Sequence, residues 1–205
     1  ERINPAVREN LLVNIHEEAE WLCHMVENLL SVTRIEEGRM QIRQSAELVD
    51  EVIKEALKHT GQSRTGRTIK VEEEDELILA KMDARLIVQV LINLIGNAVK
   101  YTPQGTDITV RVKKEKAENA ERSQVIISVC DLGNGIPDDR KERVFDMFYT
   151  GSDQVADSRR SLGLGLGLCR SIINAHGGKI WISDNIPHGA VVTFTLPAEE
   201  VALNE

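Results

Sequence analysis

The sequence predicts an α+β sandwich preceded by one long amphipathic helix. Between residues 11 and 35 the apolar positions recur in alternating steps of four and three, which is typical of a helix with a narrow apolar stripe. Beyond residue 40, short strand-like runs are mixed with three longer runs of helical period. With 205 residues, 41% of them hydrophobic, the chain is long enough for one core domain and an appended helix.

The front helix is predicted from a heptad of apolar residues. Its members are Leu12, Ile15, Ala19, Leu22, Val26 and Leu29. Gly38 follows the last turn and fits a C-terminal cap. The sequence contains no other strong heptad, so we expect the stripe to pack against a second copy or against a segment outside this chain.

The rest of the chain mixes strands and helices. The strands are expected at residues 40–44, 67–72, 76–82, 106–114, 123–131, 179–184 and 190–197. The helices are expected at 47–59, 83–102 and 166–176, with a short helical turn at 139–148. We expect 67–72 to pair with 76–82, and the last two strands to form an antiparallel pair around the turn at 185–189. The helix at 83–102 is so apolar that it should be buried on most sides.

Charge and cysteine content narrow the class of protein. A formal net charge of −8 argues against a broad basic surface, so no nucleic-acid partner is expected. The cysteines, Cys23, Cys130 and Cys169, lack CxxC spacing, and we expect them to be buried apolar residues in a reducing compartment. The sequence shows no signal peptide and no apolar run long enough to span a bilayer. Because it does not begin with Met, we expect it to be part of a longer protein.

The stretch SLGLGLGLC places Gly163, Gly165 and Gly167 at alternate positions where a helix is predicted to begin. The spacing is not the GxGxxG that follows a strand in dinucleotide-binding folds, and no Lys-Ser or Lys-Thr follows as in a Walker loop. Backbone N–H groups at a helix N-terminus suit an anion such as phosphate. A hinge or a close helix contact explains the glycines equally well, so the loop alone leaves both interpretations open.

A second candidate site lies at the end of the strand expected at 123–131. The strand ends in Asp131, and Gly133 and Gly135 come two and four residues later. Calcium loops need oxygen-bearing side chains at those two places, so the spacing excludes one. A carboxylate at a strand end can accept a hydrogen bond from an exocyclic amine, and the glycines allow an aromatic base to approach the backbone. A purely structural turn is the alternative.

Two asparagines mark the predicted buried helix. Asn93 and Asn97 are four residues apart and therefore share one face, with Lys100 and Tyr101 on the next turn. An unpaired buried amide costs about 1–3 kcal/mol, so two amides on an apolar helix indicate a polar site along that face. Packing against backbone carbonyls is the alternative.

Taken in order, NLIGNAVKYTP, DLGNGIP, VFDMFY and SLGLGLGL resemble the N, G1, F and G2 boxes of sensor histidine kinases. The resemblance spans residues 11–197. It implies the Bergerat (GHKL) ATP-binding α/β sandwich, which is shared with Hsp90, gyrase B and MutL. It also implies that residues 1–39 are the second helix of a dimerisation hairpin, 40–199 the ATP-binding domain and 200–205 a disordered tail.

The resemblance assigns roles at the adenine end of an ATP site. Asp131 should accept from the amino group of adenine, and Gly133 and Gly135 should let the base lie against the loop. Tyr101 should flank the base, and Thr193 should reach the adenine through water. Further nucleotide contacts are implied for Ile136, Phe148 and Leu168.

At the phosphate end, the resemblance implies that Asn97, with Asn93 nearby, holds Mg²⁺ against the phosphates of ATP, and that Lys100 adds positive charge. Backbone N–H donors are implied for Gly163, Gly165 and Gly167. Phe145 and Phe148 should anchor a mobile lid over the site.

Two departures from the family pattern affect the transfer step. Such kinases phosphorylate a histidine of their own that is followed by Arg, by Thr or Asn, and by Pro. His16 lacks those neighbours, so we expect the acceptor upstream of Glu1 and this chain alone to be inactive in autophosphorylation. Many relatives carry Arg after the F box, where Thr150 stands here. Arg159 and Arg160 are expected either to serve the γ-phosphate or to form a solvated basic pair.

The resemblance implies an enzyme that transfers the γ-phosphoryl group of ATP to a histidine and thence to an aspartate of a response regulator. It implies a homodimer in the full-length protein and membrane association only through absent segments, which makes this chain a cytoplasmic domain of a bacterial inner-membrane kinase. Two segments, VENLLSVTRIEEGRM and GLGLCRSIINAHGGKIW, resemble most closely those of a potassium-sensing histidine kinase.

Two other functions are weighed against the kinase. One is a nucleotide-binding module without transfer activity. The other is an ATPase of the gyrase or Hsp90 kind, in which a glutamate activates water. The sequence argues against hydrolysis because Asn93, rather than an acid, stands one turn before Asn97.

Overall fold

A computed structural model describes residues 42–60, 68–74, 77–116, 123–149 and 163–199, together with scattered residues between 4 and 33. The chain divides into two compact units, Glu1–Met40 and Gln41–Glu205. In the first unit every described residue from Val7 to Thr33 is helical, in agreement with the predicted front helix. The large apolar residues of the predicted stripe are 47–64% exposed. Among the helices described, none is both long and apolar enough to cross a membrane.

The second unit is built on a seven-stranded sheet. Its strands are β1 (Ser45–Leu48), β2 (Ile69–Glu73), β3 (Leu79–Met82), β4 (Ile108–Lys116), β5 (Ser123–Cys130), β6 (Ile180–Asp184) and β7 (Ala190–Glu199). Their order is β1-β3-β7-β5-β4-β2, and β6 also pairs with β7. Among the strand pairs in the described part of the chain, only β2–β4 is parallel. One edge of β7 is therefore shared between β6 at its beginning and β3 at its end.

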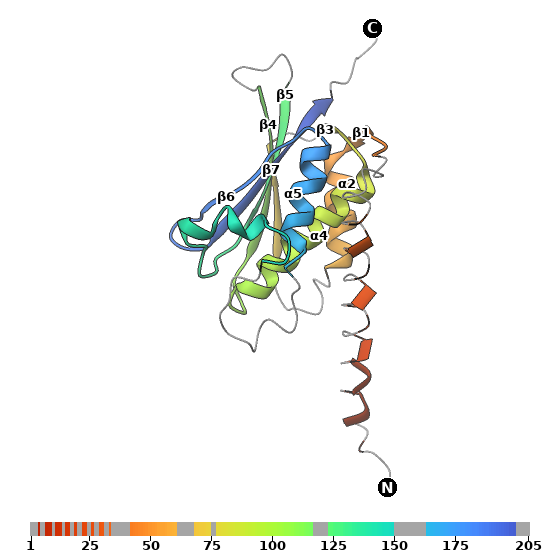
Figure 1. Ribbon diagram of the computed structural model, residues 1–205, viewed down its shortest axis with the longest axis vertical. Helices are drawn as coiled ribbons and strands as arrows, with labels where there is room; N and C mark the ends of the chain where they lie inside the picture. The colour runs from red at the N-terminus through yellow and green to blue at the C-terminus, as the bar shows by residue number, and fades with distance from the viewer. Residues whose placement is uncertain are drawn as a thin grey trace. The chain divides into compact units, whose positions relative to one another are not determined.

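Three helices cover one face of this sheet (Figure 1): α2 (Val49–His59), α4 (Ala84–Tyr101) and α5 (Gly165–Ala175). Two short 3-10 turns, η1 (Asp138–Arg140) and η2 (Arg143–Phe145), precede α5. Fully buried side chains from all three helices and from the strands form the core; the largest include Ile53, Ile87, Leu91, Leu94, Ile127, Leu168, Ile172 and Phe194. Burying each such side chain stabilises the fold by about 1.5–3 kcal/mol. The helix predicted at 83–102 is confirmed, and one face of it is buried through Ile87, Val90, Leu91, Leu94, Ile95 and Ala98. It is not buried on most sides, because Arg85, Gly96, Lys100 and Tyr101 are exposed.

Two predictions about strands are wrong. The strand expected at 40–44 lies instead at Ser45–Leu48, where it pairs with β3 and leads directly into α2. The period of this edge strand is hidden because burial does not alternate along it: Ser45 and Ala46 are both exposed, and Glu47 and Leu48 are both partly buried. The strands expected at 67–72 and 76–82 do not pair with each other, since β2 pairs with β4 and β3 with β1 and β7. The antiparallel pairing of β6 with β7 is confirmed.

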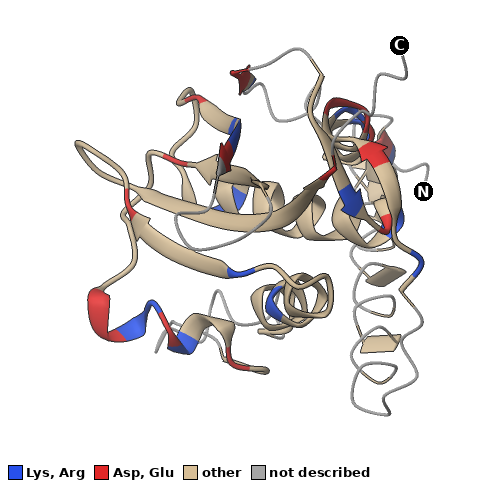
Figure 2. Cartoon of the chain, turned by 90° about the horizontal axis from the view of Figure 1, so that it is seen from above, with Lys and Arg blue, Asp and Glu red and all other residues tan. Residues whose placement is uncertain are grey.

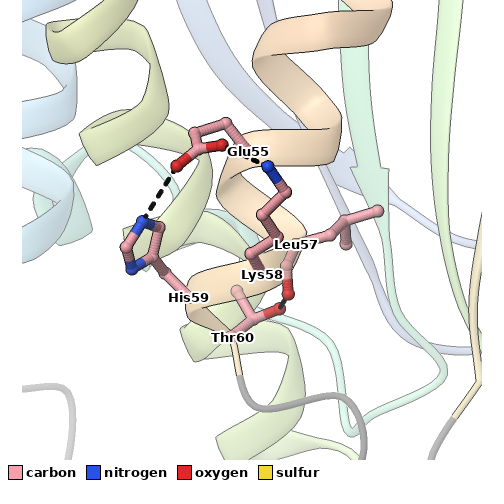
Figure 3. A network of polar contacts seen from close by, with 5 residues as sticks. All are labelled: Glu55, Leu57, Lys58, His59 and Thr60. Carbon is pink, nitrogen blue, oxygen red and sulfur yellow. Dashed lines mark hydrogen bonds and ion pairs between the residues drawn. The ribbon is translucent and has the colours of Figure 1, made fainter.

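Acidic and basic residues are interspersed over the described strands and helices (Figure 2). Exposed partners form ion pairs such as Arg111 with Glu72 across β4 and β2, at 3.0 Å. Figure 3 shows another group at the end of α2, where Glu55 contacts Lys58 at 2.7 Å and His59 at 3.3 Å. Each exposed pair contributes only about 0–1 kcal/mol to the free energy of unfolding. Most of the stability of the domain therefore comes from the buried core.

His176 connects the ends of α4 and α5 that lie away from the predicted nucleotide motifs. It follows the last residue of α5, is 2% exposed, and its Nε2 accepts a hydrogen bond of 3.0 Å from the backbone N–H of Asp83, just before α4. Its Nδ1 lies 2.8 Å from Ile172 O, which fits a neutral ring protonated at Nδ1. Burial lowers the pKa of His176, although the Ile172 carbonyl and the Asp83 carboxylate act in the opposite direction.

We expect acid to weaken the fold through His176. Because the folded state favours the neutral ring, its contribution to the free energy of unfolding is complete above about pH 6.5 and is lost as the pH falls below that value. His176→Gln keeps an acceptor near Asp83 but does not titrate. It should cost about 1 kcal/mol at neutral pH and flatten the loss of stability between about pH 7 and pH 5. Denaturant unfolding at several pH values measures both effects.

The control is His59→Gln, because His59 is exposed on α2 and its exposed pair with Glu55 contributes little to stability. A His176→Gln variant with the same pH profile as the original chain contradicts the role of this ring.

Candidate functional site

The carboxylate of Asp131, directly after β5, is fixed by two backbone donors. Its Oδ1 accepts hydrogen bonds from the N–H groups of Gly133 at 2.8 Å and Ala190 at 3.2 Å. The first bond closes a turn typical of Asp followed by glycine two residues later. The second joins Asp131 to the first residue of β7. Among the described residues nothing donates to Oδ2, so this oxygen is available to a ligand's N–H group.

Gly133 brings the loop after β5 against the end of α4. A Cβ on Gly133 would lie 2.6 Å from Tyr101 O and 2.9 Å from Asp131 Oδ1. Carbon and oxygen do not approach so closely, so only glycine permits this contact. The NLIGNAVKYTP and DLGNGIP segments, predicted to act together, therefore lie side by side.

Asn93 faces the beginning of α5. A Cβ on Gly165, the first residue of α5, would lie 3.7 Å from Asn93 Oδ1. Asn93 Nδ2 is buried and has no hydrogen-bond partner of normal geometry among the described residues; its neighbour is the thiol of Cys169, a weak acceptor. Leaving a buried amide unpaired costs about 1–3 kcal/mol. The Asn93 amide therefore has bonding capacity to offer a ligand or an ordered water.

The N-terminus of α5 lies beside Asn93. Its N-cap residue, Leu164, has no polar side chain, and no side chain of the described residues caps the helix. The first N–H groups of a helix have no partner within the helix, and the helix dipole favours an anion there. Asn97 follows Asn93 by one turn of α4 and is half-buried. The Asn93 amide and the first N–H groups of α5 thus lie close together where α4 passes α5.

Lys100 and Tyr101 end α4 at the surface. The Lys100 Nζ lies 4.9 Å from the centre of the Tyr101 ring, which is 56% exposed. The Tyr101 backbone carbonyl lies against Gly133, so the end of α4 lies next to the loop that follows Asp131.

These elements lie within the part of the chain that matches a known protein family. The family described as "Histidine kinase-, DNA gyrase B-, and HSP90-like ATPase" matches residues 82–200, more than half of the chain. The chain belongs to this family. Its strand and helix arrangement and the four sequence motifs agree with the ATP-binding fold that the sequence predicted.

Curated relatives place the chain among sensor kinases of this ATPase family. It is 39% identical to the sensor protein KdpD of Clostridium acetobutylicum over 97% of this chain and 21% of that protein. It is 29% identical to the adaptive-response sensory kinase SasA of Gloeothece citriformis, over 93% of this chain and 47% of that protein. The chain therefore spans about a fifth of KdpD and about half of SasA.

Solved structures of histidine kinases share the fold. The nucleotide-free catalytic domain of histidine kinase ThkA is 31% identical, with a TM-score of 0.59, and the match covers 77% of this chain and 96% of that one. ThkA in complex with the response regulator protein TrrA is 26% identical, with a TM-score of 0.67 over 97% of this chain and 53% of that one. The chain thus carries a sensor histidine kinase ATP-binding domain.

The F box of this ATPase domain contains one buried and one exposed phenylalanine. Phe145 is 2% exposed and packs with Ile182 and Ala190, and Ile136 lies against this cluster. Phe148 is 62% exposed and has a φ of 64°, with its N–H donating to Gly163 O at 3.0 Å. Phe145 thus anchors the F box in the core, whereas the Phe148 ring is not buried. The Phe148 backbone instead joins the F box to the start of the G2 box.

Two residues predicted to contact the nucleotide, Leu168 and Thr193, are buried in the structure. Leu168 is fully buried in the core between α5 and its neighbours. Thr193 Oγ1 lies 3.0 Å from Ser128 Oγ on the adjacent strand. Side chains alternate along a strand, so Thr193 lies on the opposite face of β7 from Ala190 and from the buried Phe194. The structure therefore does not bring Thr193 to the Asp131 carboxylate; the backbone N–H of Ala190 reaches it instead.

The remaining sequence expectations concern the lid and the cysteines. Thr150, Arg159 and Arg160 lie outside the described residues. Burial raises the pKa of the Cys169 thiol to about 12, so this thiol is neutral and acts in packing. Cys130 is buried too, whereas the expectation of burial is wrong for Cys23, which is exposed on the helix of the first unit.

We expect Gly133→Ala to damage the site and the fold together. The new Cβ must displace either the end of α4 or the Asp131 loop, which should lower the free energy of unfolding by about 1–3 kcal/mol and weaken nucleotide binding. Gly96→Ala is the matched control, because Gly96 lies within α4 with nothing within 4 Å of the added carbon. It should raise the stability by about 0.5–1 kcal/mol. Thermal and denaturant unfolding compare the two; equal effects contradict the close approach.

Proposed function

We propose that this chain binds ATP with Mg²⁺ and, within its parent protein, supplies the γ-phosphoryl group to a histidine on a segment outside Glu1–Glu205, from which it passes to an aspartate of a response regulator. The observation that carries the proposal is the Asp131 carboxylate, held with one free oxygen beside the helix that bears Asn93 and Asn97. Family membership supports ATP as the nucleotide.

The residues present fit adenine at one end of the site. Asp131 Oδ2 is free to accept from the 6-amino group of adenine, and a guanine would present a carbonyl there and be repelled. We assign contact with the flat face of the base to the loop at residues 133–135, which lies against the end of α4 at the Tyr101 carbonyl. The Tyr101 side chain is 56% exposed, and we assign it to the edge of the base. Adenine recognition thus depends on one carboxylate and the shape of one loop.

The residues also fit magnesium and phosphate at the other end. Amide oxygens are hard ligands of the kind that Mg²⁺ accepts together with phosphate oxygens, and we assign this role to Asn97 with Asn93. Bound Mg²⁺ neutralises phosphate charge, on which phosphoryl transfer largely depends. The N–H groups at the start of α5, from Gly165 onward, and the ammonium of Lys100 would add positive potential along the phosphates.

The partners follow from the relatives. Because ThkA has been solved with the response regulator TrrA, and because KdpD is a relative, we assign this chain a response regulator, KdpE-like in kind. The exposed apolar stripe of the first unit suits a homodimer in the full-length protein. Potassium sensing, and a membrane location through segments outside this sequence, are part of the same proposal.

We expect Asp131→Asn to reduce ATP affinity by about 10–150-fold without unfolding the domain. Asn keeps an oxygen for the N–H groups of Gly133 and Ala190 but opposes the adenine amine with its own NH₂, which costs about 1.5–3 kcal/mol. Calorimetric titration with ATP and GTP, with and without Mg²⁺, measures the change. Asp107→Asn, which alters an exposed carboxylate paired with Lys70, is the control. Unchanged ATP affinity in Asp131→Asn removes the adenine assignment.

We expect this chain alone to bind ATP without labelling itself. Incubation with γ-labelled ATP and Mg²⁺ should give no acid-labile phosphate on His16, and steady-state phosphate release should stay at background because Asn93 stands where a hydrolytic acid would be. Adding a parent segment that contains the acceptor histidine should restore labelling. Label on His16 overturns the assignment of the acceptor, and sustained phosphate release favours an ATPase over a kinase.

A further inference from the structure

The loop after β5 is held from outside the site by the turn between β6 and β7, residues 185–189. Asn185 Nδ2 donates a hydrogen bond of 2.7 Å to the backbone carbonyl of Asp131. His188 Nδ1 lies 3.2 Å from Gly133 O, two residues further along the loop. These contacts come from a part of the chain that none of the four sequence motifs includes.

The Asn185 amide completes the fixation of Asp131. The Asp131 N–H donates to Ala190 O at 2.9 Å, its Oδ1 accepts from Ala190 N–H, and its carbonyl accepts from Asn185. Every polar atom of Asp131 except Oδ2 is therefore engaged by Gly133, by the first residue of β7 or by Asn185. Removing the Asn185 donor frees one end of the peptide group from which the carboxylate side chain projects.

The orientation of the Asn185 side chain is itself determined. Its Oδ1 accepts from Ile186 N–H at 3.1 Å, and its backbone N–H donates to Gly189 O at 3.0 Å. Since Oδ1 faces a donor and Nδ2 faces the Asp131 carbonyl, the amide fits in this orientation and not in the flipped one. The amide therefore has little freedom to turn away from the loop.

Gly189 allows the turn at residues 185–189 to approach the backbone of Asp131 closely. Gly189 has a φ of 112°, and a Cβ there would lie 2.0 Å from Asp131 O. At the outer end, Lys141 Nζ reaches Asp184 Oδ2 at 2.8 Å and joins the segment after the loop to the last residue of β6. The Asp131 loop is thus held along its length by one neighbouring hairpin.

We propose that Asn185 is a positioning residue for adenine recognition. It acts through Asp131: it holds the Asp131 peptide group so that Oδ2 faces the 6-amino group of the bound purine. The inference rests on the proposed function, because it presumes that Asp131 receives that amino group. Its direct consequence is that Asn185 controls the preference for a 6-amino purine and leaves the affinity for the triphosphate unchanged.

The test compares ATP with purine riboside triphosphate, which lacks the 6-amino group, on the 205-residue chain. In Asn185→Asp the side chain keeps its size but loses the N–H donor and repels the Asp131 carbonyl. We expect ATP affinity to fall about tenfold, as for loss of one hydrogen bond to a positioned group, while purine riboside triphosphate affinity changes less than about twofold. Asn185→Ala should also weaken ATP binding selectively, but by a smaller factor than Asn185→Asp.

The matched control is Asn174→Asp, which makes the same change at an exposed asparagine near the end of α5 and should leave both affinities unaltered. If Asn185→Asp does not fold, as thermal unfolding would show, Asn185→Ala carries the test. Equal losses for both nucleotides, or no loss for either, overturn the positioning role. If the unaltered chain does not prefer ATP over purine riboside triphosphate, the adenine assignment of Asp131 fails instead, so the two failures are distinguishable.

Discussion

The site depends on one constraint, the fixation of the Asp131 carboxylate at the point where β5 and β7 begin to separate. One of its oxygens accepts N–H groups from Gly133 and Ala190, so the other is left for a ligand. If the carboxylate rotated freely, neither oxygen would be reserved for a ligand, and both would bind water as readily as an amine. The strand pairing from Cys130 with Val191 onward places Ala190 where it can donate, so the sheet register sets the chemistry of the site.

The packing of α4 against α5 positions the other polar groups of the site. α4 is apolar along the face that packs into the core, and the half-buried Asn93 lies beside that face where α4 passes the start of α5. The core side chains set the separation of α4 and α5, and His176 ties their other ends together. Asn93 Nδ2, which is buried and has no hydrogen-bond partner of normal geometry among the described residues, is thereby held beside the start of α5. The stability of the domain and its binding site therefore draw on the same packing.

The sequence was informative where a structure follows from local pattern. The apolar period of α4, the Asp-x-Gly turn at Asp131 and the glycines before α5 each have a local cause, and the family motifs joined them into one site. Strand partners could not be predicted in the same way, because the parallel pairing of β2 with β4 depends on residues far apart in the chain. Thr193 was assigned from its place in a motif, but the alternation of side chains along β7 directs it away from Asp131. The backbone N–H of Ala190 and the side-chain amide of Asn185 could not be predicted either, because neither contact produces a recognisable pattern of residue types in the sequence.

The most direct measurement is a crystal structure of the chain with Mg²⁺ and a non-hydrolysable ATP analogue. The account predicts the adenine amino group within hydrogen-bond distance of Asp131 Oδ2, with the phosphates between Asn97 and the N-terminus of α5. A structure in which Asp131 Oδ2 faces bulk water while the base lies elsewhere contradicts it.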